Sequence, residues 1–303
     1  MLRMIGGRRR RAECDLLRRW LGVVGLALCT TAVSAETQPL VMGILPRTSA
    51  TEIATSFEPL AAYLSARLGR PVRVETARDM DSFMGRIKRQ QFDLVHLNQL
   101  QYLRSRGPNG YEVILKSEEF GRSSIAGAIA VRADSPVRSL ADLKGRRVVF
   151  GGGPTAMVAH IEPKALLLRA GLKPGDYQEI VAPNPANALL AVYRGQADAA
   201  GIGDVLLNMP STRERVDVSR IRLLAVGHPL PQLPWAVRRG MDAAQRDRIR
   251  AALTGLRDSP EGRKILTAAG LTDLVSATDA EYQPLQRTVD LVLGRQGETS
   301  RAR

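Results

Sequence analysis

A glycine-rich turn stands where the sequence is best suited to bind a small anion. Arg147–Phe150 has the β-branched and aromatic residues of a strand, and Gly151–Gly153 follows it directly. Thr155 and the backbone N–H groups after it then lead into a helical segment, and a helix N-terminus favours negative charge. The same glycines could instead only make a tight strand-to-helix turn, so both interpretations stay open.

Polar residues also end two other predicted strands. Asn98 follows the buried strand Phe92–Leu97, whose carboxyl end should face a ligand cleft in an open α/β sheet. His96 lies one pleat earlier, and we expect it to be a core histidine. Asp204 follows the strand Ala197–Ile202 and could either pair with a cationic group of a ligand or cap a helix.

Further candidates come from a loop and a helical segment. Arg47, Thr48 and Ser49 follow the first predicted strand at its C-terminal end, where they could contact an anion. His160 lies a little over one helical turn after Thr155. It could face the same cleft or pack between the two lobes that are predicted below.

Catalysis and metal binding have little support. No serine has a recognisable nucleophile elbow or paired histidine, so we predict no enzyme, although fold alone does not exclude one. The three histidines, His96, His160 and His228, lack metal-ligand spacing. We therefore expect neither a metal site nor a cofactor.

The first 35 residues have the three parts of a cleaved secretory signal. Arginines precede the apolar run Leu21–Cys29, and Val33–Ala35 offers a small-x-small cleavage pattern. Both cysteines of the chain lie in this segment, so the mature protein should contain no disulfide. The segment also carries +5 of the formal net charge of +14. Because the remaining basic residues are scattered and aromatic residues make up 4% of the chain, nucleic acid is not an expected partner.

Short apolar strands alternate with helical patterns along the rest of the chain. This order predicts an α/β fold with a mainly parallel sheet covered by helices on both faces. Crossings near residues 125–131 and 221–230 predict two lobes, a hinge and an interlobe cleft. We assign residues 36–125 and 226–293 to the first lobe, 126–225 to the second, and 294–303 to a polar tail.

Several segments, in order and spacing, resemble the periplasmic solute-binding proteins of phosphate, phosphite and phosphonate ABC transporters. The resemblance covers nearly the whole mature chain. The segments are Gly43–Pro46, Phe57–Leu60 with Tyr63 and Leu64, Phe92–Val95, Val131–Ser135, Leu140–Gly145, Ala191–Ala199 and Asp279–Tyr282. The resemblance implies a two-lobe, type II periplasmic-binding-protein-like fold, no catalysis, and delivery of a captured solute to a membrane permease.

The same resemblance shows that the usual oxyanion-binding residues are largely replaced. Where such proteins place Ser-Thr-Ser-Gly before a proline, this chain has the segment Ala156, Met157, Val158 and Ala159. Ile125 and Met80 stand where aromatic residues of the site are usual, and Pro185 lies near the position of a pocket histidine. Loss of these donors would remove several kcal/mol of anion binding, by order of magnitude.

The expected function is that of a periplasmic solute-binding protein of an ABC importer. Its partners would be a small-molecule ligand, possibly anionic, and the inner-membrane permease. The alternative is an exported sensor or accessory protein that uses the same fold without transport. The expected ligand-binding residues are Thr48, Ser49, Met80, Asn98, Ile125, Thr155, Ala156, Met157, His160 and Asp204.

Overall fold

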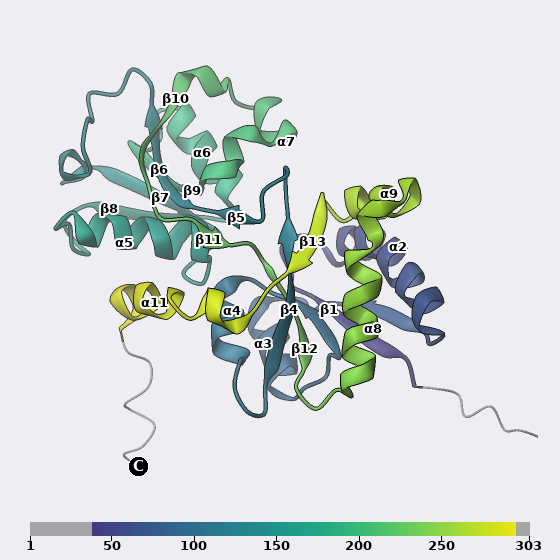
Figure 1. Cartoon of the computed structure of the whole chain (residues 1–303). Coiled ribbons are helices and arrows are strands. Elements are labelled where there is room, and N and C mark those ends of the chain that lie inside the picture. The colour runs from purple at the N-terminus through teal and green to yellow at the C-terminus, as the bar shows by residue number, and fades with distance from the viewer. Residues whose placement is uncertain (1–37, 295–303) are drawn as a thin grey trace, which may run out of the picture. The chain divides into compact units, whose positions relative to one another are not determined.

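Two large β-sheets, of six and five strands, organise the described part of the chain (Figure 1). The computed structural model describes residues 38–294, and the chain from Gln38 onward forms one compact unit. The predicted signal, residues 1–35, and all but the first residue of the predicted tail lie outside the described residues. We call the six-stranded sheet with its helices the first lobe and the five-stranded sheet with its helices the second lobe.

The first lobe combines strands from two distant parts of the chain. Its sheet has, in spatial order, β13 (Asp273–Ser276), β4 (Tyr111–Glu118), β12 (Pro234–Arg238), β3 (Leu94–His96), β1 (Leu40–Ile44) and β2 (Val72–Glu75). The strands β1, β2 and β3 are parallel, whereas β12 runs antiparallel to both β3 and β4. One strand from late in the chain therefore joins the two early parts of the sheet.

Helices cover both faces of this sheet, and each face has its own buried hydrophobic cluster. One face carries α2 (Ala50–Leu68), α8 (Ala243–Thr254) and α9 (Pro260–Ala268). The other face carries α3 (Met80–Lys88), α4 (Gln99–Ser105), α10 (Asp279–Tyr282) and α11 (Leu285–Leu293). The 3₁₀ turn Leu256–Asp258 connects α8 to α9.

The second lobe repeats this strand order. Its sheet has, in spatial order, β10 (Ile221–Val226), β6 (Gly127–Arg132), β9 (Ala199–Gly203), β7 (Arg147–Gly151) and β8 (Gln178–Ala182). Here too three parallel strands, β8, β7 and β9, are followed by an antiparallel strand, β6. The two lobes therefore share one strand order.

Helices also cover both faces of the second sheet. The helix α6 (Pro185–Tyr193) packs on one face, together with the 3₁₀ turn Asp204–Asn208. The helix α5 (Glu162–Arg169) packs on the other face with the 3₁₀ turn Leu140–Leu143. The remaining elements are α7 (Pro210–Arg213) and the 3₁₀ turn Val218–Arg220.

The two segments that cross between the lobes pair with each other. They contain β5 (Ser124–Ile125) and β11 (Leu230–Pro231), which form a short antiparallel ladder. The sequence predicts one strand over residues 125–131, but the structure breaks it at Ala126 into β5 and β6. The hinge and the second sheet thus begin as separate strands.

Three other features differ from the sequence prediction. The sheets are mixed rather than mainly parallel, because β12 and β13 in the first sheet and β6 in the second run against the other strands. The strands β12 and β13 were not predicted at all. The apolar spacing in the sequence predicts a helix over Phe57–Leu68, but α2 begins seven residues earlier, at Ala50, because Ser49 and Glu52 form a capping box there.

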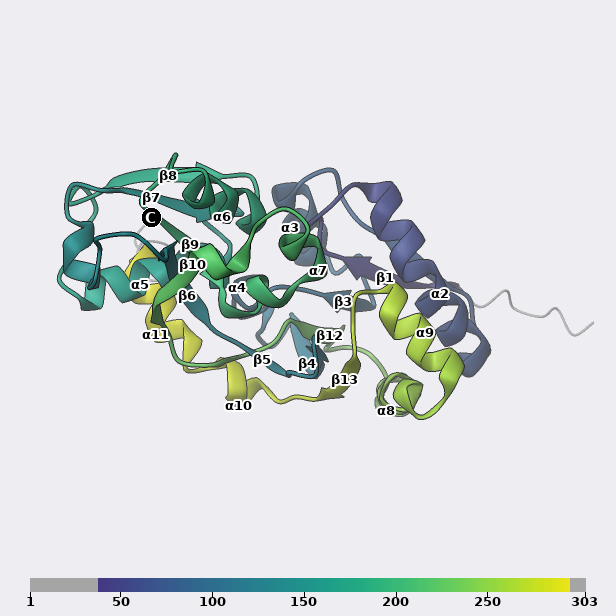
Figure 2. The ribbon, with the colours of Figure 1, turned by 90° about the horizontal axis from the view of Figure 1, so that it is seen from above.

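The last helix binds the two lobes together. The helix α11 packs against α5 of the second lobe and α4 of the first, and Figures 1 and 2 both show it beside α5. The Arg169 guanidinium of α5 donates a 3.2 Å hydrogen bond to the Thr288 hydroxyl of α11. The C-terminal part of the described chain therefore fixes one side of the hinge.

Candidate ligand site between the lobes

Asn98 links the two lobes directly. As the N-cap of α4, its Oδ1 accepts a hydrogen bond from the Gln101 N–H at 2.9 Å, and Gln101 Oε1 accepts from the Asn98 N–H at 3.0 Å. The Asn98 Nδ2 donates to the Thr155 carbonyl oxygen of the second lobe at 3.1 Å. The structure thus brings Asn98 and Thr155 together. Both the Nδ2 and the Oδ1 of the Asn98 amide already have hydrogen-bond partners.

The segment after Thr155 makes an apolar contact between the lobes. It begins as a π-helical turn, Met157–Ile161, that continues into α5. Met157 is 1% exposed and belongs, with Ile161, to the same hydrophobic cluster as Leu97 of the first lobe. Met157 is therefore part of the apolar packing between the lobes.

Backbone conformation and close packing explain why the turn before this segment, Gly151–Gly153, consists of glycines. Gly152 and Gly153 have φ values of 80° and 77°, which side chains rarely adopt. A Cβ on Gly151 would lie 2.4 Å from Cα of Pro185. The Gly152 N–H donates to the Ala182 carbonyl oxygen and the Ala156 N–H to that of Gly153. These features favour the tight-turn interpretation, since two of the backbone donors already have partners.

His160 and Met80 have partners within their own lobes. The His160 ring lies 4.9 Å from the Phe150 ring, and its Nε2 lies 3.5 Å from Glu179 Oε1 in β8. Burial lowers the pKa of His160, with a smaller contribution from Lys164. Met80 receives a 3.0 Å contact from Gln101 Nε2 on its sulfur.

His96 is a core residue, as predicted. It is fully buried, its ring stacks on Trp235 with centroids 4.6 Å apart, and its Nε2 lies 3.3 Å from Ser117 Oγ. Burial holds the pKa of His96 well below its usual value, and the nearby charge of Arg47 lowers it further. This serine and histidine lie within hydrogen-bond distance, but both are sealed in the core, where a substrate does not reach them.

Asp204 lies at the hinge. It follows β9, as predicted, and its Oδ1 accepts a 2.9 Å hydrogen bond from the Ala126 N–H. The Arg122 guanidinium lies 2.8 Å from its Oδ2. Ile125, one residue before Ala126, is half-buried in β5. The Asp204 carboxylate is therefore already paired with a cation.

A pocket of about 620 Å³ lies between the lobes, next to these contacts. The first lobe contributes the loop after β1, the start of α2, the loop after β4 and the connection from α9 to β13. The second lobe contributes Met209 and Pro210. We call this the Arg47 pocket; the lining residues used below are Arg47, Thr48, Phe57, Glu119, Phe120 and Met209.

Of the ten residues predicted to bind a ligand, Thr48 lines this pocket. Ser49 follows it and caps α2, with its hydroxyl 2.9 Å from Glu52 Oε2. Arg47, expected with Thr48 and Ser49 to contact an anion, also lines the pocket, whereas Glu119, Phe120 and Met209 were not among the predicted site residues. A possible signal was Phe120-Gly121, since a two-residue turn between strands favours glycine at its end.

The turn that carries Phe120 is unusually tight. Glu119 and Arg122 form an isolated antiparallel bridge, so Phe120 and Gly121 are its two central residues. Their φ values are 54° and 70°, as in a type I′ turn, which favours Asn-Gly. Phe120 is nevertheless 44% exposed, and its side chain lines the pocket.

Two opposite charges in the pocket lack close partners. Among residues 38–294, neither the Arg47 nor the Glu119 side chain makes a hydrogen bond or an ion pair within 4.0 Å. Burial raises the pKa of the Glu119 carboxyl, while the charge of Arg47 opposes this shift. Both groups thus retain hydrogen-bonding capacity for a ligand.

A family model described as ABC transporter, phosphonate, periplasmic substrate-binding protein matches residues 42–282. This match covers most of the chain. The chain belongs to this family.

Several solved structures, among them binding proteins of phosphonate transporters, have the same fold as this chain. XAC2383 from Xanthomonas citri, bound to ATP, is 20% identical, with a TM-score of 0.71 over 84% of this chain and 97% of that one. PhnD1 from Prochlorococcus marinus, in complex with methylphosphonate, is 15% identical, with a TM-score of 0.71 over 84% and 98%. The phosphonate-transporter binding protein PA3383 from Pseudomonas aeruginosa is 16% identical, with a TM-score of 0.66 over 82% and 85%.

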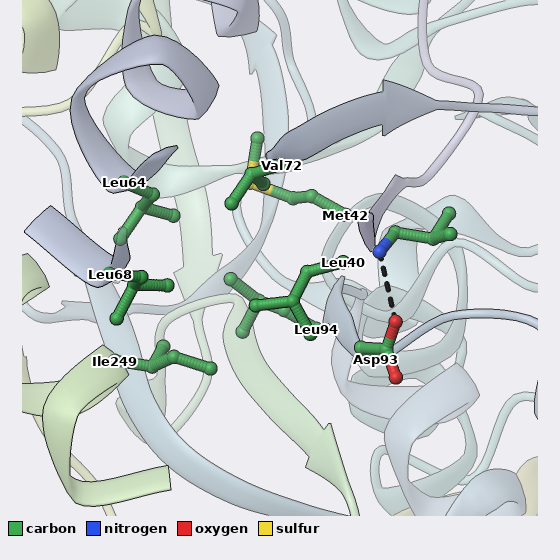
Figure 3. A pocket seen from close by; sticks show the side chains of 9 residues that line it. Leu40, Met42, Leu64, Leu68, Val72, Asp93, Leu94 and Ile249 are labelled. Atoms are coloured by element: carbon green, nitrogen blue, oxygen red, sulfur yellow. Dashed lines mark hydrogen bonds between the residues drawn. The ribbon is translucent and has the colours of Figure 1, made fainter. Parts of the chain in front are cut away.

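A second cavity in this substrate-binding protein is only a packing gap. It has a volume of about 10 Å³ and lies among apolar side chains of the first lobe, including Leu40, Leu64 and Ile249 (Figure 3). The Asp93 carboxylate beside it already accepts a 2.9 Å hydrogen bond from the Val41 N–H. A gap of this size holds at most one water.

Between Gln38 and Gly294, no group of three or more His, Cys, Asp or Glu side chains is placed to hold a metal ion. Over the same range, no helix combines the length and apolar character needed to cross a bilayer.

Proposed function

We propose that this chain is the periplasmic solute-binding component of an ABC importer and that it captures a small organic solute in the Arg47 pocket. The observation that carries the proposal is the pocket itself, which lies between the lobes of a substrate-binding fold. It contains Arg47 and Glu119 without close partners in the described chain. Export through residues 1–35 and delivery to an inner-membrane permease complete the proposal.

The proposed solute is not bound through the hydroxyl donors that the resembled proteins provide for a phosphonate. Ala156–Ala159 supplies no hydroxyl, and Met157 is buried in the interlobe contact. Placing an oxyanion beside this methionine without donors would cost several kcal/mol, by order of magnitude. Arg47 is the cation that can receive an anionic group instead, because its guanidinium has no close partner among the described residues.

The arrangement also supports binding rather than catalysis. A nucleophile needs an oriented base that the substrate can reach. The one such pair described above, Ser117 with His96, has both residues fully buried. The Arg47 pocket is lined by the hydroxyl residues Thr48, Ser56, Thr267 and Thr272, but no histidine lines it.

A thermal-shift screen of the purified mature protein tests this proposal. The panel contains phosphate, methylphosphonate, methanesulfonate, ATP, carboxylates, amines and amino acids. A ligand at 100 times its Kd stabilises the folded state by about 2.7 kcal/mol, or roughly 5–10 °C in Tm. Arg47→Gln should abolish the shift, whereas Arg78→Gln, on an exposed side chain paired with Asp79, should preserve it.

Two outcomes contradict the proposal. One is a panel in which no compound raises Tm. The other is a ligand whose shift survives Arg47→Gln but disappears on Asn98→Ala, which would locate binding at the Asn98–Thr155 contact instead.

The direct interlobe contacts favour one alternative, an exported sensor or accessory protein. Met157 packing and the Asn98–Thr155 hydrogen bond both hold the lobes together. If the lobes keep this arrangement with and without ligand, small-angle scattering will give the same radius of gyration in both states. A decrease on ligand binding would favour the transport role, since closure of lobes around a solute is a hinge motion.

A further inference from the structure

The Arg47 pocket combines two charges of opposite sign with an apolar body. Arg47 and Glu119 lie on different segments of the first lobe, one after β1 and the other after β4. The wall of the same pocket also includes Phe57, Phe120 and Met209. A ligand that satisfies all of these surfaces needs an anionic end, a hydrogen-donating end and an apolar middle.

The volume of the pocket agrees with a ligand of this size. About 620 Å³ lies within the range of 300–1,000 Å³ that is usual for sites of drug-sized organic molecules. Phosphate or methylphosphonate would leave most of this volume unfilled and would leave the apolar walls in contact with water. The size therefore favours an organic ligand with a chain or ring between its polar ends.

The acidic side chain of Glu119 favours a cation, rather than an anion, as the second polar group of the ligand. Glu119 is half-buried in the pocket wall, and a like charge beside it would be repelled. A protonated amine would instead pair with the carboxylate and supply the hydrogen bonds that it lacks among residues 38–294.

The conformation of Phe120 is an independent observation. A bulky residue with a φ of 54° is rare, and asparagine would fit the same turn at a lower cost. Strained residues of this kind cluster at ligand sites. The aromatic ring at the pocket wall gives the apolar part of a ligand a surface to pack on.

We infer that the pocket binds an amphipathic zwitterion, with its acidic group at Arg47, its amine at Glu119 and its apolar part against Phe57, Phe120 and Met209. This inference rests on the proposed function and specifies the class of its solute.

Isothermal titration calorimetry with matched probes tests the inference on the mature chain. The zwitterions are 4-aminobutanoate, 6-aminohexanoate and 8-aminooctanoate, which differ in the separation of their charges. The single-charge probes are hexanoate and hexylamine, and 6-hydroxyhexanoate replaces the amine by a neutral donor. We expect at least one zwitterion to bind about tenfold or more tightly than every probe that lacks one of its charges.

Two variants connect this preference to the pocket. Glu119→Gln should reduce the advantage of the zwitterion over hexanoate to within about twofold. Glu112→Gln is the matched control, because Glu112 is half-buried like Glu119, lies outside the pocket lining and has Arg246 as its ion-pair partner, 3.8 Å away. Arg47→Gln should weaken the zwitterion and hexanoate alike and leave hexylamine unchanged.

The outcomes separate this inference from the proposed function. The zwitterion inference is wrong if 6-hydroxyhexanoate and 6-aminohexanoate bind equally well. It is also wrong if Glu119→Gln leaves the preference for the zwitterion over hexanoate unchanged. Binding of methylphosphonate or ATP but of no zwitterion overturns it too, while the solute-binding function stands. If no compound in either panel binds, both proposals fail.

Discussion

Phe120 occupies a backbone position that suits its side chain poorly. In the two-residue turn between Glu119 and Arg122, both central residues need a positive φ. A left-handed conformation costs a residue with a Cβ roughly 1–2 kcal/mol, and asparagine tolerates it better. The ring lines the Arg47 pocket. We interpret Phe120 as a residue whose contribution to binding outweighs its cost in stability.

This interpretation predicts that Phe120→Asn changes stability and binding in opposite directions. The free energy of unfolding should rise by about 1 kcal/mol, because the turn loses its strain. Affinity for the pocket ligand should fall by about tenfold, because the apolar contact is lost. Urea unfolding and calorimetry measure the two effects.

Gly121→Ala is the control in the same turn. Gly121 has a φ of 70°, so alanine there should lower the free energy of unfolding by about 1 kcal/mol. A Phe120→Asn protein that is less stable than the native chain, or that binds its ligand equally well, would contradict our interpretation of Phe120.

The helix α4 shows how a local signal can also have a role at long range. Asn98 and Gln101 form a capping box, which residues three apart can indicate in a sequence. The same Asn98 amide also reaches Thr155, which is 57 residues away. Spacing along the chain predicts the first role, but only the folded arrangement of the lobes shows the second.

Asn98→Ala should therefore lower the free energy of unfolding by more than the loss of an ordinary helix cap does. Loss of the cap costs about 1 kcal/mol, and loss of the interlobe hydrogen bond adds about 1 kcal/mol. Asn184→Ala is the matched control, because Asn184 caps α6 through a 2.9 Å bond from the Asn187 N–H and is exposed. Denaturant unfolding of both variants gives the difference. Equal losses would show that the Asn98–Thr155 bond adds no stability.

Strands at the hinge and late in the chain were the elements hardest to predict. The strand β12 begins at Pro234 within a proline-rich stretch, which normally argues against a central strand. It lies between β3 and β4 nonetheless, with Trp235 and Ala236 buried in the two faces of the sheet. The pattern of β13, only four residues long, was too short to separate from a loop.

The packing between the lobes determines where the pocket lies. Met157 was expected as a residue that replaces an oxyanion contact, and the structure buries it in the cluster of the first lobe. Which surfaces meet across a hinge depends on the placement of whole lobes, so the composition of one segment does not reveal it. For the same reason Glu119 and Met209, which are 90 residues apart, could not be assigned to one pocket from the sequence.

Met157→Ala should loosen the contact between the lobes. Truncation of a buried methionine costs about 2–5 kcal/mol, because it removes apolar burial and leaves a cavity. Met209→Ala is the comparison, since Met209 is half-buried at the pocket wall and should cost less than about 1 kcal/mol. Urea unfolding measures both losses, and small-angle scattering should show an increased radius of gyration for Met157→Ala alone. Similar stability losses in the two variants would mean that Met157 does not hold the lobes together.

The position of β12 also has a consequence for the order in which the chain is able to fold. The sheet of the first lobe remains divided between β3 and β4 until residues 234–238 are available. All five strands of the second sheet, in contrast, lie between Gly127 and Val226. During synthesis, the second lobe can therefore be completed first. The early strands of the first lobe, β1–β4, emerge before the second lobe. Until β12 and β13 follow, they have an open sheet edge and exposed apolar surface.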